Sequence, residues 1–120
     1  MTQPVLVWCE IPVTDLSRAM AFYGTILGAE LKEDNTGPNP MAMLPSTDAN
    51  GSAGHLYPGK PAPVGTGNTV HLGLTCSLEE GMERVKTAGG KVLSPPIEIP
   101  SGRFAYCLDL DGNSLGIFAA

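Results

Sequence analysis

The chain has 120 residues, which is the length of one domain or of two small modules that share a core. Its 42% hydrophobic and 16% charged residues argue against a disordered chain and against a coiled coil. Seven basic and twelve acidic residues give a net charge of −5, which disfavours binding to nucleic acid. No apolar run is long enough to span a membrane, no signal peptide is recognisable, and the three cysteines are widely spaced. We therefore expect a cytoplasmic protein with reduced thiols that binds neither nucleic acid nor membranes.

The first half of the chain carries signals for one helix among short strands. Alternation predicts a strand over 5–11. Asp15 is a suitable N-cap for a helix over 16–27, which Gly28 ends. The apolar positions of this helix are Leu16, Ala19, Met20, Tyr23, Ile26 and Leu27. Further strands are predicted over 29–33, 41–44 and 54–57, with turn-rich segments at 35–39 and 47–52.

The second half repeats this order after a Pro/Gly-rich linker over 60–68. A strand is predicted over 69–75. Ser77 and Glu80 form a capping-box pattern that opens a helix, and Gly89 and Gly90 end it. Three more strands are predicted over 91–93, 104–108 and 114–118, and the last two are joined by a tight turn.

The two halves are related by an internal repeat. Asp15, Met20 and Gly28 recur as Ser77, Met82 and Gly90, each 62 residues later. Each half therefore reads β-α-β-β-β, and the sequence predicts an α+β protein with eight strands and two helices.

Several segments of the sequence resemble glyoxalase-like proteins of the vicinal oxygen chelate superfamily, which includes glyoxalase I, bleomycin-resistance proteins and extradiol dioxygenases. The resemblance rests on Glu10–Tyr23 followed by Leu27-Gly28, on Val70–Leu74, on Arg84–Val92, and on Phe104–Asn113 with Leu115–Ile117. It implies a single glyoxalase-like domain over 1–120, with module one at about 4–59, the linker at 60–68 and module two at about 69–119. It also implies that the two βαβββ modules form an eight-stranded, cup-shaped mixed sheet, with the helices outside and a cavity inside.

The resemblance also indicates where a metal would bind. In metal-dependent relatives the ligands come from the first strand, the strand closing module one, the fifth strand and the last strand. The ligand positions on the first, fifth and last strands fall on Trp8, His71 and Gly116. On the strand that closes module one, the candidate ligand is His55. Since tryptophan cannot ligate a metal and glycine has no side chain, we expect no cofactor. The weaker alternative is a divalent metal held by a rearranged set of two histidines and a carboxylate: His71, Glu10 and His55.

Five residues are candidates for ligand binding: Trp8, Glu10, His55, His71 and Arg103. Trp8 could form an aromatic wall for a flat ligand. Glu10 could act as a base in the cavity or pair with an arginine. His71 could be a ligand, a general base or a polar wall residue. Arg103 could bind a carboxylate of the ligand, although pairing with a glutamate is the commoner fate of such an arginine.

The function that we predict is binding of a small organic ligand in the cup without a metal, with no catalytic residue assigned. One alternative is a metal-dependent lyase, isomerase or dioxygenase with a site around His71. Another is an interaction subunit whose cup is filled by its own side chains. We also expect a homodimer, because a short two-module cup leaves sheet edges and apolar surface that a second chain would cover.

Overall fold

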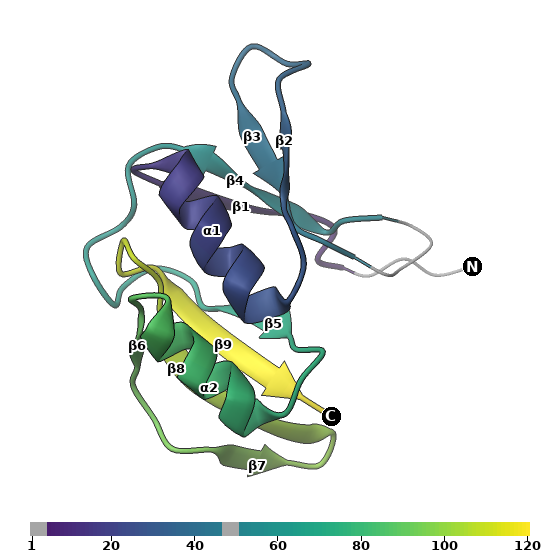
Figure 1. Ribbon diagram of the computed structural model, residues 1–120, viewed down its shortest axis with the longest axis vertical. Coiled ribbons are helices and arrows are strands. Elements are labelled where there is room, and N and C mark those ends of the chain that lie inside the picture. The colour runs from purple at the N-terminus through teal and green to yellow at the C-terminus, as the bar shows by residue number, and fades with distance from the viewer. Residues whose placement is uncertain (1–4, 47–50) are drawn as a thin grey trace.

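The computed structural model describes residues 5–46 and 51–120, which form two helices and two mixed sheets (Figure 1). The first sheet has the order β1-β4-β3-β2 and the second has the order β5-β9-β8-β6, with β7 paired to β8. In each sheet one pair is parallel, β1 with β4 and β5 with β9, and the other pairs are antiparallel. The α+β class and the two modules are therefore confirmed.

The elements of module one are β1 (Cys9–Val13), α1 (Leu16–Leu27), β2 (Lys32–Asp34), β3 (Met41–Met43) and β4 (Gly54–Pro58). Those of module two are β5 (Val70–Gly73), α2 (Leu78–Thr87), β6 (Lys91–Val92), β7 (Ile97–Ile99), β8 (Gly102–Leu108) and β9 (Ser114–Ala119).

Both helices begin at the residues that the sequence predicts. Asp15 accepts a hydrogen bond of 3.1 Å from the backbone N–H of Arg18, and Gly28 ends α1 in the left-handed conformation with φ 66°. Ser77 accepts a hydrogen bond of 3.2 Å from the backbone N–H of Glu80. The carboxylate of Glu80 accepts a hydrogen bond of 3.1 Å from Arg84. Of the two hydrogen bonds of a capping box, the structure therefore shows the one from the Glu80 N–H to Ser77 and not the one from the Ser77 N–H to Glu80.

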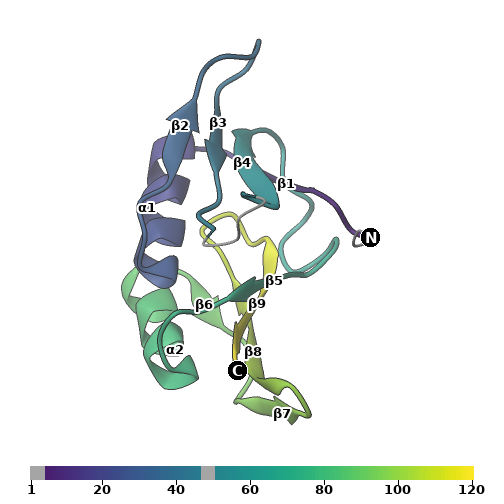
Figure 2. The same ribbon diagram turned by 90° about the vertical axis from the view of Figure 1, so that its right-hand side faces the viewer.

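The helices cover the same side of the two sheets, and the core lies between them and the strands (Figure 2). Ile11, Val13 and Leu56 face α1 and are at most 3% exposed. Phe22 is also buried, although it lies outside the predicted apolar positions of α1. A Cβ on Gly90 would lie 2.7 Å from the Phe22 ring, so this ring packs against module two rather than only against its own sheet.

The turn after β8 joins the two modules. Tyr23 of α1 donates a hydrogen bond of 2.6 Å to Asp109. Asn113 donates one of 2.9 Å to the carbonyl of Pro12, and Thr14 donates one of 2.6 Å to Asp111. These contacts tie the β8–β9 turn to the end of β1 and to α1.

Three features differ from the sequence prediction. β1 begins at Cys9 rather than at residue 5, because its partner β4 begins at Gly54, opposite Cys9. The strand β7 is additional. The strands are divided between two sheets, and β1 and β5 each lie at the edge of their sheet among the described residues. Most of the predicted loop 47–52 lies outside the described residues.

Within residues 5–46 and 51–120, neither helix has the length and apolar character that crossing a membrane requires.

Candidate functional site on the open sheet faces

Each sheet has one face that the helices leave uncovered, here called its open face. On the first sheet, Ile11 and Leu56 point to α1, so the alternation of side chains places Glu10 and His55 on the open face. Tyr57 and Met43 share this face, since Tyr57 lies two residues beyond His55 and Met43 lies opposite it on β3. The open face therefore carries the Glu10 carboxylate among aromatic, imidazole and thioether groups, with Lys32 and Asp34 of β2 on the same face beyond β3.

A chain of two short contacts connects Trp8, His55 and Glu10. The indole Nε1 of Trp8 donates a hydrogen bond of 3.0 Å to Nδ1 of His55, and Nε2 of His55 lies 3.3 Å from Oε1 of Glu10. Because an indole N–H can only donate, Nδ1 must present a lone pair. The proton of the neutral ring is then on Nε2, the nitrogen that lies beside the Glu10 carboxylate. The contact joins a neutral imidazole to a carboxylate.

The three side chains differ sharply in exposure. The His55 side chain is 11% exposed and that of Glu10 is 65% exposed, while Trp8 is 40% exposed. The His55 ring also contacts Tyr57, with ring centroids 6.1 Å apart in an edge-on arrangement. The buried imidazole thus contacts two aromatic residues and lies beside a carboxylate that stands in solvent.

The open face of the second sheet is aromatic. The rings of His71, Phe104 and Tyr106 contact one another edge-on, with centroids between 5.1 and 6.1 Å apart. The His71 ring lies directly over Gly116, where a Cβ would collide with its Nδ1. His71 is exposed, and Tyr106 is 39% exposed. This face offers flat apolar surface to a ligand but no carboxylate.

Arg103 lies apart from these groups. Its guanidinium makes two hydrogen bonds, of 2.8 and 2.9 Å, to the carboxylate of Glu79 in the first turn of α2. These bonds lower the pKa of Glu79 to about 2. The structure therefore brings together Trp8, Glu10 and His55, places His71 on the other sheet, and shows Arg103 paired with a glutamate.

The residues present do not fit the metal centre that the resemblance would imply. Trp8 and Gly116 offer no ligand atom, and both ring nitrogens of His55 are engaged. In the part of the chain that the structure describes, no three histidine, cysteine, aspartate or glutamate side chains come together as a metal site requires. The rearranged set of His71, Glu10 and His55 is therefore not assembled within one chain.

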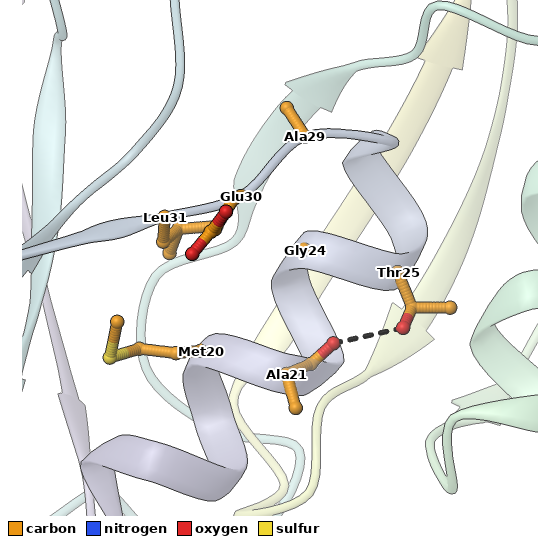
Figure 3. Close-up of a pocket in the computed structure, with 7 residues that line it drawn as sticks. All are labelled: Met20, Ala21, Gly24, Thr25, Ala29, Glu30 and Leu31. Atoms are coloured by element: carbon orange, nitrogen blue, oxygen red, sulfur yellow. Dashed lines mark hydrogen bonds between the residues drawn. The ribbon is translucent and has the colours of Figure 1, made fainter.

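Two hollows lie away from these faces. One, of about 470 Å³, runs between α1 and the segment before β2 and is lined by Met20, Ala21, Gly24, Thr25, Ala29, Glu30 and Leu31 (Figure 3). The other, of about 720 Å³, lies at the N-terminal end of α2 and includes Cys76 and Arg103. Neither includes Trp8, Glu10, His55 or His71.

Three aromatic residues on the open faces are not among the candidates that the sequence predicts: Tyr57, Phe104 and Tyr106. Strand parity could have found Tyr57, because it shares a face with His55 at position i+2. Alternation along one strand also places Phe104 and Tyr106 on the same face. Their position beside His71 depends on the pairing of β8 with β9 and of β9 with β5.

The sequence profile of the Glyoxalase/Bleomycin resistance protein/Dioxygenase superfamily matches residues 5–117. The chain belongs to this superfamily. No curated protein sequence matches the chain significantly.

Solved structures of the superfamily fold are similar at low sequence identity. A hypothetical protein SA1046 from S. aureus is 22% identical with a TM-score of 0.72, covering 100% of this chain and 99% of that one. The fosfomycin resistance protein FosX from Listeria monocytogenes is 20% identical with a TM-score of 0.69, covering 99% and 95%. A glyoxalase I mutant from Zea mays is 24% identical with a TM-score of 0.68, covering 92% of this chain but 45% of that one. These likenesses support the fold.

Proposed function

We propose that the protein binds a small organic molecule on its open sheet faces without using a metal ion. The observation that carries this proposal is the pair of contacts of His55, which accepts a hydrogen bond from Trp8 and lies 3.3 Å from Glu10, in the region where the resemblance places ligands of a metal. Aromatic side chains with a few fixed polar groups are the usual lining of sites for organic ligands. The aromatic face around His71, Phe104 and Tyr106 supplies further surface of this kind.

We also propose that the protein is a homodimer in which a second copy closes the open faces into a cup. Both β1 and β5 are edge strands in the described part of the chain, and exposed edges favour pairing with another chain. The segment before β1 is apolar and exposed, with Val5, Leu6 and Val7 at 105%, 79% and 62%. The three cysteines are unpaired, which supports a cytoplasmic location.

Ligand binding can be tested on protein purified without chelator. A panel of aromatic amines, neutral aromatic compounds and aromatic acids would be added while the indole N–H resonance of the single tryptophan is followed by NMR. We expect at least one compound to shift this resonance saturably and to raise the melting temperature, because a ligand that binds only the folded state stabilises it.

Metal content measured on the same protein separates this function from a metal-dependent one. We expect far less than one metal ion per chain. One bound ion per chain, lost in His71→Ala, would overturn metal-free binding. A panel in which no compound shifts the tryptophan resonance would overturn ligand binding at these faces.

A further inference from the structure

The contact between His55 and Glu10 leaves the carboxylate without a counter-charge. His55 accepts a hydrogen bond from Trp8 at Nδ1, so the imidazole that lies 3.3 Å from Glu10 is neutral. No lysine or arginine within the described ranges forms an ion pair with Glu10. The side chain of Glu10 is 65% exposed, so its second oxygen is accessible to a ligand.

The groups around Glu10 suit a positive charge. Trp8 precedes Glu10 by two residues and Tyr57 follows His55 by two residues, so both lie on the same face as the carboxylate. The rings of both contact His55, the residue opposite Glu10. The faces of indole and phenol rings attract cations, and the attraction is strongest for tryptophan. The net charge of −5 of the whole chain favours approach of a cation as well.

We propose that Glu10, Trp8 and Tyr57 form a subsite for an organic cation, such as an ammonium or amidinium group attached to an apolar body. The proposal rests on the proposed function and names the ligand class for that site. The carboxylate makes a charge-assisted hydrogen bond to the cation, and the two rings contact its flanks. Met43, opposite His55 on β3, extends this surface with an apolar side chain that the body of the ligand contacts.

His55 and the Trp8 N–H act as positioning groups in this subsite. The Trp8 N–H selects the tautomer of His55 that carries its proton on Nε2, and this nitrogen lies 3.3 Å from one oxygen of Glu10. Phenylalanine at position 8 would keep an aromatic ring but remove the N–H. In Trp8→Phe we therefore expect the two tautomers of His55 to mix, as measured by the nitrogen-15 shifts of the ring, and cation binding to weaken, as measured by the rise in melting temperature because this variant lacks the indole N–H.

The test compares two probes of similar size and opposite charge, phenethylamine and 3-phenylpropionate, with 2-phenylethanol as the neutral probe. Binding is followed by the Trp8 indole N–H resonance. We expect phenethylamine to bind at least about tenfold more tightly than the other two, since hydrogen bonds to charged groups exceed neutral ones by this much. In Glu10→Gln the preference is lost while 2-phenylethanol binds as before. Glu33→Gln is the matched control, because Glu33 lies on β2 opposite Ala42 and points away from the open face.

The outcomes separate this proposal from the function on which it rests. If the probes bind but phenethylamine is not preferred, or if its preference survives in Glu10→Gln, the cation subsite is wrong and ligand binding stands. If neither these probes nor the wider panel binds, both are wrong.

The nitrogen-15 shifts of the histidine rings give a test without any ligand. The chain has two histidines, so His71→Asn assigns the spectrum. At pH 7 we expect His55 to show a protonated Nε2 and an unprotonated Nδ1. A doubly protonated His55 ring would give Glu10 a positively charged partner and would contradict the proposed cation subsite.

Discussion

The phenol of Tyr23 donates a hydrogen bond of 2.6 Å to the carboxylate of Asp109, which lies 86 residues further along the chain. Tyr23 is fully buried in α1, and Asp109 begins the turn after β8. Asp109 also accepts hydrogen bonds of 2.9 Å from the backbone N–H groups of Asp111 and Asn113. One carboxylate therefore shapes the turn of module two and holds that turn against module one.

Removing the Tyr23 hydroxyl should destabilise the fold. In Tyr23→Phe the buried carboxylate of Asp109 loses a partner, and we expect the free energy of unfolding to fall by about 1–3 kcal/mol. Urea denaturation measures this change. Tyr106→Phe is the control, because its partly exposed ring should change stability by less than about 0.5 kcal/mol. Equal stability of the two variants would show that the Tyr23–Asp109 bond contributes nothing.

The same tyrosine should make the protein sensitive to alkali. Burial, and then the charge of Asp109, raise the pKa of Tyr23 well above its usual value of 10.0. Above pH 10 the unfolded chain releases this proton while the folded chain keeps it, so the free energy of unfolding falls as the pH rises. Denaturation curves from pH 8 to 11 should show a steeper loss in the wild type than in Tyr23→Phe. Parallel losses would contradict the raised pKa of Tyr23.

Cys107 should be inert to thiol reagents in the folded protein. Its side chain is fully buried, and burial raises its pKa to about 11. Cys9 and Cys76 are partly exposed. Labelling at pH 8 followed by mass spectrometry should therefore modify Cys9 and Cys76 first, and Cys107 only when the chain unfolds in urea. Labelling of Cys107 in the folded protein at the rate of Cys76 would contradict its burial.

Arg103 should control the titration of Glu79. Its two hydrogen bonds hold the pKa of Glu79 at about 2, below the usual value of 4.5. In Arg103→Ala we expect this pKa to return towards 4.5, as measured by carbon-13 NMR of the carboxyl group. The stabilisation by this pair is present above pH 4.5 and is lost as the pH falls towards 2, and it is small because both groups are in solvent. An unchanged titration of Glu79 would rule out Arg103 as the cause.

A side chain at position 116 should displace His71. In Gly116→Ala the new Cβ would collide with the His71 ring, which must turn into solvent and leave Phe104. We expect a loss of about 1 kcal/mol in stability and the disappearance of the ring-current shift of His71 in the proton NMR spectrum. Gly73→Ala is the matched control on the same face, because a Cβ there meets open space. If both variants leave the His71 resonances unchanged, the ring does not lie over residue 116.

Local signals in the sequence predicted much of the fold. Asp15 and Ser77 determine where the helices begin because capping depends on nearby backbone groups. Features set by distant partners were not predictable in this way. β1 begins at Cys9 because β4 begins at Gly54, and Phe22 is buried because Gly90 leaves room for its ring. Such pairings depend on tertiary contacts that periodicity does not contain.

The candidate site was predictable in its residue types but not in its contacts. Trp8, Glu10 and His55 were each expected to contribute, yet their contacts depend on the register that places Glu10 opposite His55. That register also determines which partner Glu10 meets, a histidine rather than an arginine. The tautomer of His55 follows from this geometry and has no signature in the sequence.

The ring of His71 also limits how readily a metal ligand could be introduced on the last strand. A carboxylate introduced at residue 116 would meet the imidazole before it reached any ion, so that substitution alone would be unfavourable. Trp8 would have to be replaced as well, which would release His55 from its hydrogen bond. Building a metal site on the last strand therefore requires several coordinated changes, each unfavourable by itself.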